Sequence, residues 1–467
     1  MAKASLLFLL QREGFERMIK MDFSEKSAQT NKSKSTQIQS IDAFQAFKHD
    51  VDHEFLEWVN QKSSSGQRRD KLLNGGANTA AFSLIDESVR KEFGIFFSGH
   101  ALANFVASKV TTLLANGASV IDPTCGAGDL LIACARHYPK QTNYESTLNF
   151  WASRIGGIDI HETFTKTVSS RLKLLATESH IPNKNESSSQ LDFPHIFTAD
   201  AFKQAEFISE FDLVVTNPPY GNIQASSDLE WSQGKVQIAA VFIDRILKHA
   251  KAGQEIVAVL PDVLRSGTRY SKWRNWVALK AEVMSVEIVG KFDKTTDVDV
   301  FVMHLRVGEN QNSRWPDINL PQINTTDLKI ETLFNVRVGP VVPHRDKKNG
   351  PSRLYIDCSH TTNGVEITPS QICQYNGTSY KAPFVVVHRT SSPDDPNRLV
   401  TSIINTDDLV MVENHLIIIQ PIDGQLQTCR KLLKKLKSNS VREWINQRIR
   451  CRHLTVTAIR DIPVSWD

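Results

Sequence analysis

Residues 212–221 read Asp-Leu-Val-Val-Thr-Asn-Pro-Pro-Tyr-Gly, and this stretch decides the fold that we expect. Its apolar run, Leu-Val-Val, is typical of a buried strand. Pro218 and Pro219 must end that strand, because proline donates no hydrogen bond to a strand ladder. Asn217 and Tyr220 would then lie at the carboxyl edge of a sheet, where open α/β sheets bind their ligands. The plainer alternative is a strand followed by a tight turn, since Asn-Pro is a common turn pair.

A second stretch with chemical character lies upstream. Residues 118–131 read Ala-Ser-Val-Ile-Asp-Pro-Thr-Cys-Gly-Ala-Gly-Asp-Leu-Leu, which predicts a short strand ending at Asp122, a turn, and a helix. Gly126 and Gly128 allow a ligand to approach the backbone closely, as in nucleotide-binding strand-turn-helix units. A lone Gly-x-Gly is a weak signal, whereas Asp-Pro-x-Cys-Gly-x-Gly after a strand is much more specific.

Acidic residues end two further predicted strands. Residues 155–160 and 195–202 read as strands with Asp159 and Asp200 at their tips. Either carboxylate alone could be a surface residue at a strand end. Repetition of the geometry favours a ligand site, and Asp159 stands where such folds bind ribose hydroxyls.

The sheet continues downstream of these segments. Residues 255–261 read as a buried strand stopped by proline, and two apolar strands follow within residues 286–289 and 298–305. Phe292 lies in the connection between those two strands. We therefore predict an α/β fold, with a mixed sheet and helices on both faces.

These motifs together resemble the S-adenosylmethionine-dependent DNA adenine-N6 methyltransferases, over Glu92 to Val307. The loop at 122–128 resembles their cofactor loop, and Asn217–Tyr220 resembles their catalytic motif. Gly94–Gly99 is similar to the amino-terminal cofactor motif, which usually ends Phe-Thr-Pro or Phe-Ser-Pro. Here the end is Phe-Ser-Gly, so the proline is missing. The order of the motifs resembles the gamma arrangement of these enzymes, and a Rossmann-like domain is implied.

The resemblance implies a catalytic role for the segment after the strand. The Asn217 side-chain oxygen and the Pro218 carbonyl would each accept an N–H of the adenine amine, which orients its lone pair at the methyl sulfonium. Pro219 would help to hold the loop rigid. Tyr220 would stack on the target base and Phe292 would pack on its other face. Because the amine is buried in a duplex, the base must be flipped out.

The resemblance also implies a site for S-adenosylmethionine and no metal. Asp122 and the glycines would lie along the methionine part, Asp159 would bind the ribose hydroxyls, and Asp200 would accept from the cofactor's adenine amine. The expected cofactor-binding residues are Phe97, Ser98, Asp122, Pro123, Gly126, Gly128, Asp159 and Asp200. Ser98 is also expected to cap the helix that follows it.

Two other regions flank this domain, which we place at residues 91–310. Residues 1–90 predict a helical and flexible region, with a polar stretch at 24–40 and a core-facing helix from Phe44 to Val59. Residues 311–467 contain short strands, at 335–340, 383–389 and 414–419, followed by two helices.

The two C-terminal helices carry many basic residues, opposed on the same faces only by Glu443. This pattern fits either a solvated helix face or a surface that contacts phosphates. By resemblance the region is an α+β target-recognition domain, with loops 344–348 and 388–392 as candidates for reading bases. The basic residues are Arg430, Lys431, Lys434, Lys435, Lys437, Arg442, Arg448, Arg450 and Arg452.

Composition limits the location of the protein. No apolar run is long enough to span a bilayer, and the short opening apolar run lacks a cleavage site, so we interpret it as a helix start or an over-extended gene start. The six cysteines form no Cys-x-x-Cys pair, which favours reduced thiols and a cytoplasmic protein over a zinc site. The net charge of +4 is too small to establish a nucleic-acid partner by itself.

The sequence thus favours a monomeric, site-specific DNA adenine-N6 methyltransferase that acts on double-stranded DNA. It would be the modification enzyme of a restriction-modification or related defence system, with the restriction endonuclease encoded separately. One alternative is methyl transfer to an RNA amine or a protein glutamine amide, because Asn-Pro-Pro-Tyr serves other planar nitrogens. Another is a non-catalytic DNA-binding subunit, which the intact motifs disfavour.

Overall fold

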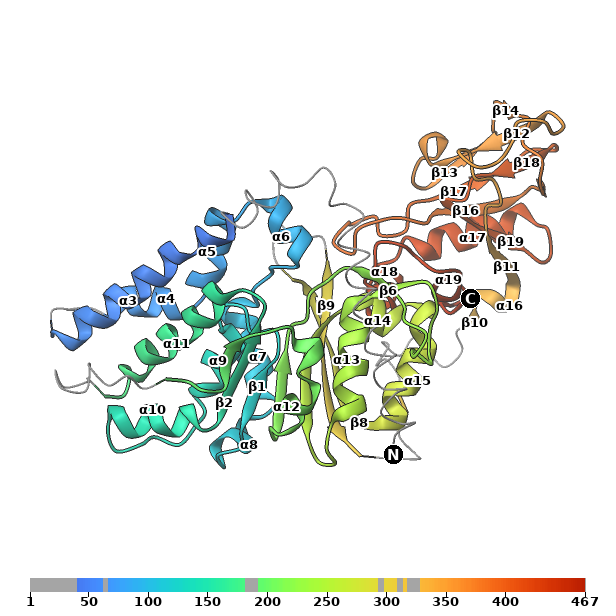
Figure 1. Cartoon of the computed structure of the whole chain (residues 1–467). Helices are drawn as coiled ribbons and strands as arrows, with labels where there is room; N and C mark the ends of the chain where they lie inside the picture. The colour runs from blue at the N-terminus through green and yellow to red at the C-terminus, as the bar shows by residue number, and fades with distance from the viewer. Residues whose placement is uncertain are drawn as a thin grey trace. The chain divides into compact units, whose positions relative to one another are not determined.

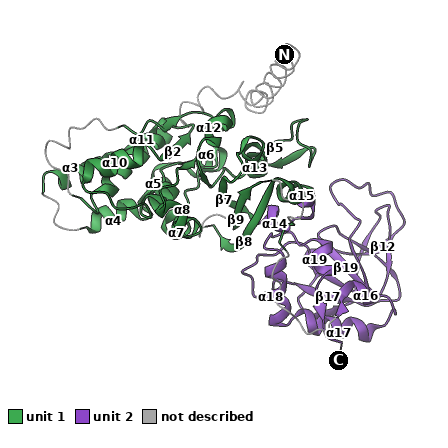
Figure 2. Cartoon of the chain, turned by 90° about the horizontal axis from the view of Figure 1, so that it is seen from below, with its two compact units in different colours: residues 1–261, 272–292, 300–316 green, residues 262–271, 293–299, 317–467 purple. Residues whose placement is uncertain are grey.

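A computed structural model describes residues 40–61, 66–180, 192–292, 298–308, 314–316 and 328–466. The described residues form two compact units, shown in separate colours in Figure 2. The first takes its residues from 1–261, 272–292 and 300–316, and the second from 262–271, 293–299 and 317–467. The expected helix start at the amino end and nearly all of the polar stretch 24–40 lie outside the described residues. Among the helices described, none is both long and apolar enough to cross a membrane.

A mixed sheet of seven strands forms the centre of the first unit (Figure 1), in the order β3-β2-β1-β4-β7-β9-β8. Strands β3 to β7 in this order are parallel, whereas β9 runs antiparallel to β7. All residues of β1 and β4 are buried, as expected for strands covered on both faces. The strands are β1 Val120–Asp122, β2 Ile155–Asp159, β3 Ile196–Thr198, β4 Leu213–Thr216, β7 Glu255–Pro261, β8 Ala281–Lys291 and β9 Asp299–Val307, and a separate ribbon pairs β5 Asn222–Gln224 with β6 Lys235–Gln237.

Helices cover both faces of this sheet, so the predicted fold class is confirmed. Helix α9 contacts α7, α11 and the central strands, and α12 packs on α13. The predicted core-facing helix is α3, which packs against α11 and buries Phe47, Val51 and Val59. The helices of this unit are α3 Gln45–Val59, α4 Gln67–Leu73, α5 Gly76–Leu84, α6 Glu87–Phe93, α7 Gly99–Ser108, α8 Thr111–Ala115, α9 Asp129–Ala135, α10 Tyr144–Ala152, α11 Glu162–Ala176, α12 Ala205–Ser209, α13 Ile238–His249 and α15 Ser271–Lys280.

Two predicted strands have different lengths in the structure. The strand expected over 195–202 ends at Thr198. The Asp200 carboxylate accepts a hydrogen bond from the Phe202 backbone N–H at 3.0 Å, which starts the short 3-10 helix η3 Ala201–Lys203. The strand expected over 286–289 is β8, which extends over eleven residues and leaves Phe292 just beyond its end.

The second unit combines two sheets with helices, which agrees with the predicted α+β class. One sheet has the order β11-β19-β16-β17-β13 and the other β14-β12-β18-β15. Helices α17 and α18 bury an apolar face that includes Leu432, Leu436, Trp444 and Ile445. The elements are α14 Asp262–Ser266, η4 Thr268–Tyr270, β10 Leu328–Lys329, α16 Ile330–Leu333, β11 Phe334–Val338, β12 Arg353–Ile356, η5 Cys358–His360, β13 Val365–Ile367, β14 Gln371–Cys373, β15 Tyr380–Lys381, β16 Phe384–His388, β17 Thr401–Ile404, β18 Leu409–Val412, β19 Leu416–Pro421, α17 Leu426–Leu436, α18 Asn439–Arg448, α19 Val456–Arg460 and β20 Pro463–Val464.

Part of the predicted basic surface is neutralised within this unit. Arg430 pairs with Glu366 at 2.8 Å, and Arg448 pairs with Asp461 at 3.2 Å. Arg450 pairs with Asp299 at 2.5 Å. Glu443 is still the only acid on the two helices, but acids from distant segments pair with several of these arginines.

Candidate active site

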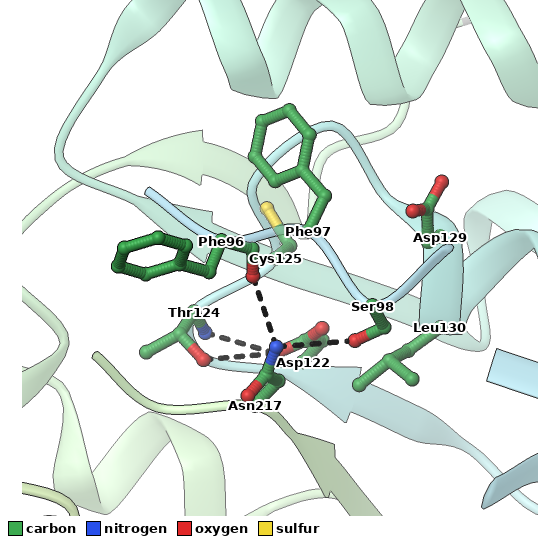
Figure 3. A pocket seen from close by; sticks show the side chains of 9 residues that line it. All are labelled: Phe96, Phe97, Ser98, Asp122, Thr124, Cys125, Asp129, Leu130 and Asn217. Atoms are coloured by element: carbon green, nitrogen blue, oxygen red, sulfur yellow. Dashed lines mark hydrogen bonds between the residues drawn. The ribbon is translucent and has the colours of Figure 1, made fainter. Parts of the chain in front are cut away.

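Asn217 follows directly after β4 and is fixed by hydrogen bonds on both sides of its amide. Its Nδ2 donates to the Phe96 carbonyl oxygen at 3.0 Å and to the Ser98 hydroxyl at 3.2 Å (Figure 3). A carbonyl oxygen can only accept, so these contacts identify the nitrogen side of the amide. The Asn217 Oδ1 consequently points the other way, where it accepts from the Tyr220 hydroxyl at 2.7 Å.

Ser98 has a different role from the expected helix cap. It stands before the first residue of α7, but no helix N–H donates to its side chain. Its hydroxyl oxygen instead accepts from Asn217. This hydrogen bond links the segment Gly94–Gly99 to the segment after β4, and it helps to orient the Asn217 side-chain amide.

Tyr220 and Phe292 contact each other in this structure. Their ring centroids are 5.8 Å apart and the rings are nearly perpendicular, at 86°. Phe96 meets Phe292 edge-on as well, at 6.4 Å. A base stacked between Tyr220 and Phe292 would need parallel rings further apart, so both rings must turn and separate for the predicted sandwich to form.

The two prolines after Asn217 have distinct surroundings. Pro218 is buried, and Pro219 is half-buried against Gly94. A Cβ on Gly94 would lie 2.6 Å from the Pro219 Cβ, and Gly94 has a φ of +65°. Glycine at position 94 therefore gives Pro219 the room to pack against the neighbouring segment.

The loop between β1 and α9 is held closely by two side chains. Gly126 has a φ of +48°, and a Cβ there would lie 2.6 Å from the Phe97 ring. Gly128 has a φ of +88°, and a Cβ there would meet Val168 of α11 at 3.0 Å. Both positions therefore need glycine, for the backbone conformation and for the lack of space. Because neither residue has a side chain, the loop can pack closely against Phe97 and Val168.

Asp122 ends β1 with a carboxyl group removed from water. Its Oδ1 accepts from the Thr124 backbone N–H at 3.0 Å and from the Thr124 hydroxyl at 3.3 Å. Burial raises the pKa of Asp122 to about 7, although these hydrogen bonds oppose the shift. Thr124 also bonds to the Thr216 hydroxyl at 2.9 Å, which links the ends of β1 and β4.

Asp159 ends β2 and closes onto the glycine loop. Its Oδ2 accepts from the Gly126 N–H at 3.1 Å, and its Oδ1 accepts from the His161 N–H at 2.8 Å. Burial of the carboxyl group raises the pKa of Asp159 to about 6, against the effect of these bonds. Asp200 lies beyond β3, where its carboxylate caps η3.

One pocket collects residues from these segments (Figure 3). Of the predicted residues it contains Phe97, Ser98, Asp122 and Asn217. Asp159 bonds to the neighbouring loop through the Gly126 N–H, Pro123 is buried next to Asp122, and Asp200 caps η3; none of these three lines the pocket. The pocket also contains residues that were not singled out, although all belong to the two upstream motifs: Phe96, Thr124, Cys125, Asp129 and Leu130.

Across residues 40–61, 66–180, 192–292, 298–308, 314–316 and 328–466, no group of three or more His, Cys, Asp or Glu is arranged to hold a metal ion. The pocket instead offers carboxyl, hydroxyl and amide groups beside aromatic rings. Such a lining suits an organic ligand with polar groups.

Comparisons with known proteins agree with this description. Residues 130–292 match the family model of the Eco57I restriction-modification methylase, a segment that includes Asn217–Tyr220 and Phe292. The search of curated proteins found no match to the chain. The predicted resemblance to restriction-modification methyltransferases is confirmed for this segment.

Several solved structures align with this chain, and one of them does so with a TM-score above 0.5. The type IIL restriction-modification enzyme MmeI, in complex with DNA, aligns with a TM-score of 0.51 at 13% identity, over 86% of this chain and 70% of that chain. The type IIG restriction endonuclease BpuSI aligns with a TM-score of 0.43 at 11% identity, over 86% and 61% of the chains. A class I S-adenosylmethionine-dependent methyltransferase structure from Listeria monocytogenes aligns with a TM-score of 0.36 at 12% identity, over 59% and 91%.

Proposed function

We propose that this chain is a site-specific DNA methyltransferase that transfers the methyl group of S-adenosylmethionine to the N6 amine of adenine. It would act on double-stranded DNA as the modification enzyme of a restriction-modification system. The family match over residues 130–292 supports the methylase class. The choice of an adenine amine is our inference from Asn217 and its neighbours.

The orientation of the Asn217 amide carries this proposal. Both hydrogens of Nδ2 are used within the chain, by Phe96 and Ser98. The oxygen has two lone pairs and accepts one hydrogen bond, from Tyr220. The remaining lone pair is suited to accept an N–H from a planar amine, with the Pro218 carbonyl as the second acceptor.

Methyl transfer to this amine depends on the orientation of the nitrogen lone pair more than on a general base. The lone pair of an exocyclic amine is conjugated with its ring, so the nitrogen is a weak nucleophile. Two acceptors on its N–H groups favour a pyramidal nitrogen and aim its lone pair. The nitrogen would form its bond to the methyl carbon while the bond between that carbon and the sulfonium sulfur breaks, so that S-adenosylhomocysteine leaves as a neutral thioether. The methylated nitrogen would then lose a proton to solvent.

The pocket fits the proposed cofactor. S-adenosylmethionine would supply a methyl group on a sulfonium centre, together with an ammonium group and ribose hydroxyls. Burial raises the pKa of Asp122 to about 7 and that of Asp159 to about 6, and a bound ligand with a positive charge and hydroxyl donors would stabilise the ionised carboxylates. Gly126, Gly128, Phe97 and Ser98 would line the same site, with Pro123 and Asp200 at its margins.

Several properties of the working protein follow as proposals from the same assignment. The second unit would bind DNA as a target-recognition domain, with loops 344–348 and 388–392 as candidates for base contacts. Tyr220 and Phe292 would separate to stack on the flipped adenine. We propose a monomer in the cytoplasm, with a restriction endonuclease as a separate partner.

Methyl transfer to three classes of acceptor tests the proposal. The full chain would be incubated with tritiated S-adenosylmethionine and with unmethylated genomic DNA, tRNA or a protein extract. Label in DNA that disappears in Asn217→Ala would support the proposal. Label only in tRNA or protein would reject the DNA target, and cofactor binding without any transfer would favour a non-catalytic DNA-binding subunit.

A further inference from the structure

Arg171 is a fully buried arginine at the base of the active-site loops. It lies on α11, and its side chain is 0% exposed. Its Nη1 donates to the Ala127 carbonyl at 2.6 Å and to the Asp129 Oδ1 at 2.9 Å, and its Nη2 donates to the Leu73 carbonyl at 2.9 Å. A buried charge is costly unless it is paired and hydrogen-bonded, so this guanidinium must hold these groups together.

Asp129 also contacts the first residue of α7. Its Oδ1 faces Arg171, and its Oδ2 accepts from the Gly99 backbone N–H at 2.9 Å. Asp129 is itself buried and belongs to the pocket. One carboxylate therefore connects the start of α9 with the start of α7.

Gly99 is the residue that makes this contact possible. It has a φ of +66° and donates its backbone N–H. Proline, which usually stands here in the related motif, has no N–H and a φ fixed near −65°. The Asp129 contact is consequently available only because this chain lacks that proline.

Ser98 and Asn217 complete the connection. Ser98 precedes Gly99, and its hydroxyl accepts from the Asn217 Nδ2 at 3.2 Å. We propose that Arg171, Asp129 and Gly99 form a strut that positions Ser98 and thereby orients the Asn217 amide, in place of the missing proline. Arg171 and Asp129 are positioning residues in this proposal, which relies on the proposed function for the role of Asn217.

Asp129→Asn cuts the strut at one point. Arg171 requires an oxygen, so the new amide would turn its Oδ1 toward Arg171 and its Nδ2 toward the Gly99 N–H. Two donors would then face each other, and the Gly99 contact is lost while the Arg171 contact remains. Asp244→Asn is the matched control, because Asp244 is equally buried at 3% side-chain exposure and pairs with Lys248 on α13.

The side-chain amide signal of Asn217 reports on the strut directly. The full-length protein would be labelled with ¹⁵N-asparagine, and the Asn217 signal identified by its absence in Asn217→Asp. We expect Ser98→Ala and Asp129→Asn to shift this signal, and the double variant to match Ser98→Ala, because the two residues act in series. An Asn217 signal that stays at its wild-type position in Asp129→Asn would overturn the proposal.

Hydrogen exchange in the wild-type protein provides a test that needs no variant to fold. The first N–H groups of a helix have no acceptor within the helix. The Gly99 N–H at the start of α7 should nevertheless exchange slowly, because Asp129 accepts from it. Fast exchange of this N–H, equal to that of an unprotected helix start, would overturn the strut.

Kinetics separate the strut from the proposed function. We expect kcat for DNA methylation to fall about tenfold or more in Asp129→Asn, because misplacement of a reacting group is costly. The KM for S-adenosylmethionine should change less, and Asp244→Asn should keep the wild-type kcat. If the wild type transfers no methyl group to DNA, the proposed function fails, and the Asn217 signal and Gly99 exchange still decide the strut.

Discussion

At the scale of single residues, the site consists of buried carboxyl groups and of one side-chain amide, that of Asn217, whose orientation is fixed by hydrogen bonds. Phe96 and Ser98 select that orientation. The sequence could predict that Asn217 and Asp122 each lie at the end of a strand of the sheet, but not that these two strands are neighbours. It could not predict the Tyr220–Asn217 bond or the Ser98 contact, which depend on how loops distant in the sequence meet.

The Asp122 carboxyl group should make the stability of the protein depend on pH. Its pKa is about 7 in the folded protein and 3.8 without the fold. Between these values the folded state binds more protons than the unfolded state, so the free energy of unfolding falls as the pH rises through this window. Asp122→Asn should remove a share of this decline on the order of 1–4 kcal/mol.

Urea unfolding of the cofactor-free protein at pH 5 and pH 8 measures this effect. Asp159→Asn is the comparison variant: it removes a second raised pKa, and it affects the pKa of Asp122 only by removing the Asp159 charge, which contributes less to that shift than burial does. The assignment would be contradicted if the free energy of unfolding of Asp122→Asn changed between pH 5 and pH 8 by as much as that of the wild type.

The Tyr220 hydroxyl should contribute to turnover apart from its ring. Tyr220→Phe keeps the ring against Phe292 and removes the donor to the Asn217 Oδ1. We expect kcat to fall about tenfold, which corresponds to one hydrogen bond in the transition state, with unchanged cofactor affinity. Single-turnover kinetics would measure this, with Tyr220→Ala expected to lose more; an unaltered rate in Tyr220→Phe would show that the hydroxyl has no part.

At the scale of elements, the glycine loop and α11 are fitted to each other. Gly128 has a φ of +88°, and an added Cβ would meet Val168 at 3.0 Å. Gly253 has almost the same φ, +85°, but an added Cβ would meet no described atom within 4 Å. The two glycines therefore differ in packing while sharing nearly the same left-handed backbone conformation.

Alanine substitutions of Gly128 and Gly253 should distinguish the cost of overpacking from the cost of placing a side chain on a left-handed residue. Gly253→Ala should lower the free energy of unfolding by about 1–2 kcal/mol, the cost of a left-handed residue with a side chain. Gly128→Ala should lose a further 1–3 kcal/mol or so from overpacking. If urea titrations showed equal losses in the free energy of unfolding for the two variants, α11 would have to shift to accommodate the added methyl group without cost.

Element boundaries set the limit of prediction from the sequence. Strong apolar runs located β4 and β7 well, since buried parallel strands admit few other interpretations. The end of β3 was missed because the Asp200 carboxylate bonds to the Phe202 N–H, a local choice that periodicity does not reveal. The length of β8 was missed because much of it is only half-buried and lacks a clear apolar pattern.

At the scale of the whole molecule, charge distribution connects the second unit with the proposed DNA partner. Lys431 and Lys434 are exposed on α17, whereas Arg448 pairs with Asp461. The basic residues of the two helices are thus of two kinds, exposed cations and internal ion-pair partners. The sequence could give their number but not this division, because the acids come from other segments.

Salt dependence of DNA binding tests that division. If Lys431 and Lys434 contact phosphates, changing both to glutamine should reduce the slope of log K against log salt by about 0.9 for each lysine. Arg448→Gln should leave the slope unchanged and lower the stability instead. Fluorescence anisotropy at several salt concentrations measures the slope, and an effect of Arg448→Gln equal to that of the lysine pair would contradict the assignment.

The central claim is that Asn217 directs methyl transfer to the adenine amine in DNA. The most direct measurement is mass spectrometry of nucleosides from unmethylated DNA after incubation with S-adenosylmethionine and either the wild type or Asn217→Ala. The account predicts N6-methyladenine with the wild type and none with the variant. A different methylated base, or an equal yield of N6-methyladenine from Asn217→Ala, would contradict it.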